Sequence, residues 1–195
     1  NPIEAAGLAY GELFGIQVAG VPVETDFTLI PDDTRFTLHP FGNVSGTTGA
    51  AIESMSIASG VTSFLRPEDG AWDPSNPNDF YFVTTASYTR PSRLWRLRFD
   101  DGSAPERGGT IAMLLDGNEG QRMFDNLTIT RRGQIFLQED PGVPLSAPDH
   151  LAVIWRYTIE TDTLTAVARA DPDRFVEGAS RYLGTRDEES SGIID

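Results

Sequence analysis

Short apolar runs separated by turn residues recur along this chain, and the pattern predicts a protein built mostly of β-strands. The runs are rich in β-branched and aromatic residues, and each is bounded by Asp, Asn, Gly or Pro. The runs around Trp95 and Trp155 alternate in part with Arg or Thr, as half-buried strands do. The predicted strands cover residues 35–41, 80–83, 94–99, 110–115, 134–137 and 152–159.

Helical patterns are scarce. The best candidates are residues 172–177, which follow the capping residue Asp171, and a weaker segment at 46–59. The first 34 residues predict loop and one strand. The 19 Gly and 13 Pro are spread throughout and form no linker, so residues 1–195 are expected to be a single domain or part of a larger one.

An internal repeat determines the predicted architecture. The segment at 67–73 resembles that at 124–130: each is an acidic entry into a strand, followed by a turn, a second strand, a loop and a strand with a Trp. A third copy begins near Glu189, where Gly192 and Asp195 match Gly70 and Asp73. Blade-like repeats are therefore expected at about 62–120 and 121–170, with a third begun at 186–195.

Such a unit, completed by a fourth strand, is the antiparallel four-stranded blade of a β-propeller with long loops. The predicted fold is all-β, a partial or incomplete propeller, and a β-sandwich is the alternative. Trp72, Trp95 and Trp155 are expected to pack between blades. Two blades and the start of a third cannot close a ring, so we expect further C-terminal blades or self-association.

Charge and composition argue against several classes of partner and chemistry. The chain has 29 acidic and 15 basic residues, which gives a formal net charge of −14 and makes nucleic acid an improbable partner. No apolar run is long enough to predict a membrane span. There is no Cys and no Lys, so disulfides, thiolate metal sites and Schiff-base chemistry are excluded.

Carboxylates occupy equivalent positions in the repeats. Superposition places Glu68 over Asp125 and beside Glu188 and Glu189, all at the start of a first strand, and Glu139 and Asp140 follow the second strand of the second repeat. First strands line the channel of a propeller, so these acids should converge. Converging carboxylates repel one another unless a cation neutralises them, and oxygen ligands favour calcium or magnesium. The alternative is that each acid caps a turn or faces solvent.

Other polar residues carry weaker signals. Arg66, beside Glu68, suits a phosphate or a salt bridge, and the even-numbered members of the Arg run at 90–98 share one strand face, which predicts a solvated face. Ser190, Ser191, His39 and His150 lie in no catalytic-triad context. The Asx-rich segments at 73–79 and 116–120 are interpreted as turns in preference to calcium loops.

Four strings, at 64–73, 124–127, 137–142 and 187–195, resemble bacterial proteins related to PhoX-type alkaline phosphatases. The resemblance spans roughly residues 14–195. It implies an exported β-propeller, secreted or periplasmic, that hydrolyses phosphate esters with calcium. One branch also uses iron with a Cys ligand, which this chain lacks. By position the resemblance implies Glu68, Glu139 and Glu188 or Glu189 as metal ligands, with Asp69, Asp125, Asn126 and Asp140 as further ligands or residues that support them. Arg66 and Glu68 are the candidate catalytic residues.

The leading hypothesis is therefore a metal-dependent phosphoesterase in which carboxylates hold calcium and Arg66 neutralises developing charge. One alternative is a non-catalytic secreted propeller whose calcium joins blades and whose loops bind a partner. Another is a metal-dependent lactonase or esterase of the same architecture.

Overall fold

The computed structural model describes residues 11–25, 27–142, 150–185, 187–188 and 190–193. Within these residues the chain forms ten strands, two α-helices and a 3-10 turn, so the prediction of a mostly β protein is confirmed. The strands are β1 (Leu13–Val18), β2 (Thr34–Gly42), β3 (Pro67–Asp73), β4 (Asn76–Thr84), β5 (Arg93–Phe99), β6 (Gly109–Leu115), β7 (Phe124–Ile129), β8 (Gln134–Glu139), β9 (Val153–Thr158) and β10 (Thr163–Arg169). The helices are α2 (Gly49–Ala58) and α3 (Pro172–Phe175), with η1 (Pro105–Arg107) as the 3-10 turn.

All six predicted strands and both predicted helices are present. The Thr48 hydroxyl caps α2 by accepting from the amide of Ala51, and the Asp171 side chain caps α3 by accepting from the amide of Asp173. In the described part of the chain no helix is long and apolar enough to cross a membrane.

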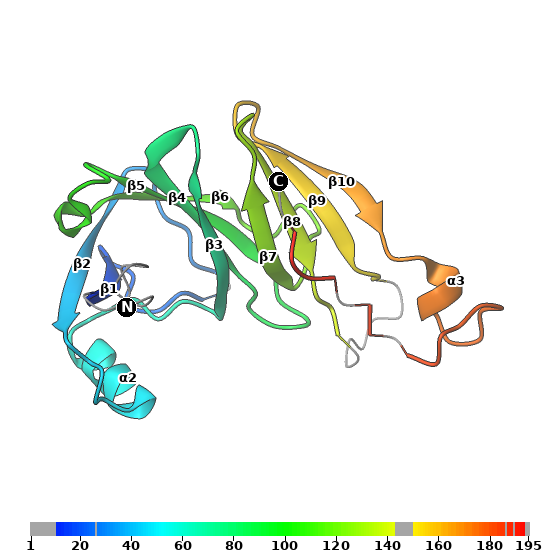
Figure 1. Ribbon diagram of the computed structural model, residues 1–195, viewed down its shortest axis with the longest axis horizontal. Helices are drawn as coiled ribbons and strands as arrows, with labels where there is room; N and C mark the ends of the chain where they lie inside the picture. The colour runs from blue at the N-terminus through cyan, green and yellow to red at the C-terminus, as the bar shows by residue number, and fades with distance from the viewer. Residues whose placement is uncertain (1–10, 26, 143–149, 186, 189, 194–195) are drawn as a thin grey trace, which may run out of the picture.

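The strands form two antiparallel sheets (Figure 1). One sheet has six strands in the order β1-β2-β6-β5-β4-β3 and curls into a half-barrel, and the other has four in the order β10-β9-β8-β7. The predicted unit of four strands therefore fits the second sheet, whereas β1 and β2 extend the first to six. Both strands were predicted, but their addition to this sheet was not, because β2 pairs with β6, which lies far along the chain.

Two glycines allow β6 to approach its neighbours closely where the first sheet curls. A Cβ atom on Gly108 would lie 2.2 Å from the carbonyl oxygen of Phe36, and one on Gly109 would lie 1.9 Å from that of Arg98. Gly108 also has a φ of 72°, which glycine adopts without steric cost. Only three residue pairs then join β2 to β6, so the junction depends on these glycines.

The internal repeat is visible in the pairing of strands. Pro67 begins β3 and Phe124 begins β7, and each strand pairs with the next in a meander, β3-β4-β5 and β7-β8-β9. The two first strands lie next to each other where the sheets meet (Figure 1). The correspondence of 67 with 124 inferred from the sequence is therefore the correspondence of the strands.

Alternation along the strands produces two cores. On β4 and β5, Tyr81, Val83 and Leu94 face the second sheet and pack with residues such as Leu137 and Tyr157. Residues of the opposite face fill the curl of the first sheet: Phe82, Trp95, Leu97 and Phe99 pack there with Val18, Phe36 and Ile111.

The Trp prediction is wrong in two of three places. Trp95 is buried inside the curl and not between the sheets, and Trp72 is half exposed. Only Trp155 packs against the core between the sheets.

Candidate functional site

The predicted acids gather where β3 and β7 begin and β8 ends. Three contacts bring these segments together. The amide of Thr85 donates to the carbonyl of Arg66, the Thr85 hydroxyl donates to the carbonyl of Phe124, and Phe124 pairs with Glu139. We call this region the carboxylate end, comprising Arg66, Glu68, Asp69, Asp125, Asn126, Glu139, Asp140 and Glu188. Glu189 lies outside the described residues.

Glu139 is fully buried and receives four hydrogen bonds. Its Oε1 accepts from the amide of Arg122 and from Trp155 Nε1, both at 2.8 Å. Its Oε2 accepts from His150 Nε2 at 2.7 Å and from the amide of Val153 at 3.0 Å. An ionised carboxylate has about four lone-pair positions, so this set fills them. A cation that used Glu139 as a ligand would have to displace one of these donors.

Three other predicted ligands join separate segments through backbone amides. Asp69 Oδ2 accepts from the amide of Leu127 at 2.9 Å, which joins β3 to β7. Asn126 Oδ1 accepts from the amide of Gly192 at 3.3 Å, and Glu188 Oε1 accepts from that of Ala152 at 3.2 Å. The last two bonds hold Glu188 and Gly192 against the second sheet.

Glu68 and Asp125 are the most open of the predicted ligands. Glu68 is one-third exposed, and its Oε1 meets Arg66 Nη2 at 3.3 Å. Asp125 is half-buried and makes no side-chain hydrogen bond or ion pair with the described residues. Asp140 is half-buried, and its amide donates to the carbonyl of Met123. The repeat-equivalent pair, Glu68 and Asp125, therefore keeps oxygens available for a ligand.

The carboxylate end has the oxygen donors that calcium prefers. Among the described residues, however, no group of three or more His, Asp or Glu side chains is placed to hold a metal ion. The described donors alone therefore do not make a complete calcium site. The chain has no Cys for the iron site of the resembling family.

Backbone strain is concentrated in this region. Arg66, Ala86 and Met123 have positive φ angles of 57°, 60° and 50°. Backbone hydrogen bonds tie down these segments: the amide of Ala86 donates to the carbonyl of Leu65, beside Arg66, and the amide of Asp140 donates to the carbonyl of Met123. Each such conformation costs about 1–3 kcal/mol and persists only where the surroundings enforce it, as they often do at functional sites.

The strain at Arg66 can be measured with two substitutions that both remove its side chain. We expect R66G to be more stable than R66A by about 1 kcal/mol, because only glycine adopts the left-handed conformation without a Cβ clash. Urea denaturation of the two variants gives this difference. Equal stability, or a more stable R66A, would mean that the backbone at Arg66 is not strained.

A buried ion pair supports the strained segment. Arg93 Nη1 donates to Glu24 Oε1 at 2.6 Å, and both side chains are at most 2% exposed. The same oxygen accepts from the Thr84 hydroxyl at 3.1 Å, and Glu24 Oε2 accepts from the amide of Leu65 at 2.8 Å. The pair therefore fixes the backbone immediately before Arg66.

Ser92 extends this buried network to the second sheet. Its hydroxyl donates to the carbonyl of Thr85 and accepts from the amide of Phe124, both at 3.0 Å. Gln121 Nε2 donates to the carbonyl of Ser92 at 3.2 Å and to Glu119 Oε2 at 3.1 Å. Buried polar groups are costly unless they are satisfied, and this network fixes the relative positions of β3 and β7.

The sequence did not indicate this network. The even-numbered members of the Arg run were predicted to share a solvated face; Arg96 is half-buried, and Arg93, on the opposite face, is fully buried. Arg90 and Arg98 are exposed, as predicted, and the half-exposed Arg98 side chain pairs with buried Asp79. Glu24 lies 69 positions before Arg93, so no local pattern could connect them.

The two Asx-rich segments are turns, as predicted. Asp73 Oδ1 accepts from the amide of Ser75, and Asp116 Oδ1 accepts from the amide of Asn118. His39 lies edge-on to Phe41, and His150 is bound to Glu139.

Comparisons with known proteins add no assignment to this geometry. No protein-family model matches the chain, and no curated protein matches it.

Proposed function

We propose that the chain belongs to an exported, metal-dependent phosphoesterase whose substrate binds at the carboxylate end. The observation that carries this proposal is the strained backbone of Arg66 and Met123 beside two open carboxylates, Glu68 and Asp125. Strained residues cluster at active sites, ligand clamps and switch regions. The choice of a phosphate ester as substrate rests on the resemblance of the sequence strings.

The residues divide into two groups in this proposal. Glu68 and Asp125 would hold calcium, with Asp140 and Glu189 as further candidates, and the ion would neutralise phosphate oxygens and acidify a water. Arg66, half exposed, would bind the phosphate. Asp69, Asn126, Glu139 and Glu188 are positioning residues, because their oxygens already accept from backbone amides.

We further propose that the two sheets are neighbouring propeller blades, with β3 and β7 as innermost strands. Their adjacency and the equal meanders that follow them support this arrangement. In such an arrangement the starts of the first strands open on one mouth of the channel, where the acids lie.

A non-catalytic, calcium-stabilised binding protein is the second candidate. It is favoured by the engagement of Asp69 and Glu139 with backbone donors, which is what carboxylates that join segments do. In this case a cation would stabilise the fold without turnover.

The test measures calcium affinity by calorimetry, and p-nitrophenyl phosphate hydrolysis with calcium or with EDTA. We expect chelator-sensitive turnover, and a fall in kcat/KM of at least about a hundredfold in E68Q, because a group that holds the catalytic ion is lost. E53Q, in exposed α2, is the matched control and should behave as wild type. Circular dichroism checks that E68Q is folded.

The two candidates give different results. Calcium binding that raises Tm without any turnover would support the non-catalytic protein and contradict the phosphoesterase. Neither binding nor turnover would contradict both. Turnover unchanged in E68Q would remove Glu68 from the site.

A further inference from the structure

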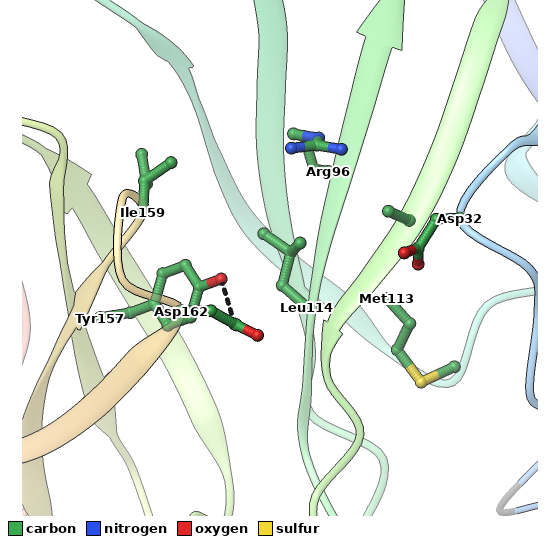
Figure 2. Close-up of a pocket in the computed structure, with 8 residues that line it drawn as sticks. Asp32, Arg96, Met113, Leu114, Tyr157, Ile159 and Asp162 are labelled. Atoms are coloured by element: carbon green, nitrogen blue, oxygen red, sulfur yellow. Dashed lines mark hydrogen bonds between the residues drawn. The ribbon is translucent and has the colours of Figure 1, made fainter.

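A second region with unassigned chemistry is a cavity of about 240 Å³ between the two sheets (Figure 2). Arg96 of β5 and residues 112–114 of β6 line one side, and Tyr157, Ile159 and Asp162 of the β9–β10 hairpin line the other. Asp32, from the loop before β2, completes the lining. Pockets for drug-sized ligands hold roughly 300–1,000 Å³, so this one suits a smaller molecule.

The charged groups of the cavity are held apart from one another. Within the described part of the chain Arg96 forms no ion pair, although two carboxylates line the same cavity. Asp162 instead accepts a 2.7 Å hydrogen bond from the Tyr157 hydroxyl, and its φ of 49° places it in the left-handed region. Figure 2 shows Arg96, Asp32 and Asp162 around the Leu114 side chain.

Arg96 also has a buried donor with no acceptor. Its Nε is shielded from solvent and has no hydrogen-bond partner among the described residues. Leaving such a donor unsatisfied is unfavourable, and a carboxylate suits a guanidinium well. Burial and the Asp162 carboxylate raise the pKa of Tyr157 above its ordinary value, so the phenol remains a neutral donor to Asp162.

The cavity matches a ligand with two opposite charges and an apolar part. Arg96 contributes one positive charge, and Asp32 and Asp162 contribute two negative charges, so a lone anion such as phosphate meets a net negative lining. Met113, Leu114 and Ile159 supply apolar surface. We propose that this cavity binds a small apolar α-amino acid, with its carboxylate on Arg96 and its ammonium group on Asp32.

This site is separate from the carboxylate end. Gln134, at the start of β8, pairs with Thr158 beside the cavity, whereas Glu139 ends the same strand. Gln134 and Glu139 are five positions apart along the strand, or roughly 17 Å at about 3.3 Å per residue. The inference therefore does not depend on the proposed phosphoesterase activity.

The test is calorimetric titration with L-leucine, acetate, ethylamine and inorganic phosphate, in EDTA so that no metal takes part. We expect L-leucine to bind, and each of the other three probes to bind at least about tenfold more weakly, because each lacks one charge or the apolar part. D32N and R96Q should each weaken L-leucine binding by at least about tenfold. D33N is the matched control, because Asp33 does not line the cavity, and it should bind as wild type.

Several results would overturn the proposal. These are no L-leucine binding, undiminished binding in D32N or R96Q, or acetate or phosphate binding as tightly as L-leucine. Asp32 is exposed, so D32N tests the site even where R96Q disturbs folding.

Discussion

Replacing Glu24 by Gln is expected to lower the free energy of unfolding by about 3–5 kcal/mol. The substitution leaves the Arg93 guanidinium buried without its countercharge, and removing one partner of a buried ion pair has an effect of this size. Glu24 also accepts from Thr84 and from the amide of Leu65, so the change weakens two further hydrogen bonds of the same network.

Urea denaturation measures this loss, with D100N as the matched control. Asp100 also pairs with an arginine through two hydrogen bonds, of 2.8 Å and 2.6 Å to Arg35, but both partners are about half exposed. Exposed pairs contribute about 0–1 kcal/mol, so D100N should remain close to wild type. A similar, small loss in E24Q and D100N would show that the buried pair does not hold the first sheet together.

The strands were predictable because each carries its signal locally. Residues 80–83 are all aromatic or β-branched and are bounded by turn residues, and the run is apolar throughout because Tyr81 and Val83 face one core and Phe82 faces the other. The helix α2 was detectable from its composition, although it contains no buried residue. The half-barrel was not predictable, since its closure depends on three residue pairs between β2 and β6, far apart in sequence.

The candidate site was predictable only in part. The repeat aligned Glu68 with Asp125, and the structure places the starts of their strands side by side. The repeat could not show that Glu139 would be saturated by four donors, because these come from β9, from the residue before Met123 and from His150. Position in a repeat identifies where an acid lies, whereas its partners depend on tertiary contacts.

The strain, the ion pair and the acids form one mechanical unit. Glu24 fixes Leu65, Leu65 and Arg66 bond to the chain at 85–86, and Thr85 bonds to Phe124 in the second sheet. The unit therefore keeps the starts of β3 and β7 in a fixed relation. Fixed relative positions are what a binding site needs from the residues beneath it.

Replacing Glu139 by Gln is expected to lower the free energy of unfolding by about 3 kcal/mol or more. An amide offers one acceptor oxygen, and its NH2 group faces donors that the carboxylate had satisfied, above all the amide of Val153. Hydrogen bonds to a charged group contribute about 1.5–3 kcal/mol each, and a buried unsatisfied donor adds a penalty of its own. E160Q, an exposed Glu→Gln change in the β9–β10 hairpin, should be neutral within about 0.5 kcal/mol.

The same variant distinguishes a positioning role for Glu139 from a ligand role. If Glu139 only orders the chain around Trp155 and Val153, E139Q is less stable than wild type by the same amount in calcium and in EDTA. If Glu139 binds calcium, the wild type alone gains from the ion, and the difference between the two proteins shrinks in EDTA. Because four donors already fill the carboxylate, we expect equal differences in the two conditions, and a difference that disappears in EDTA would make Glu139 a metal ligand.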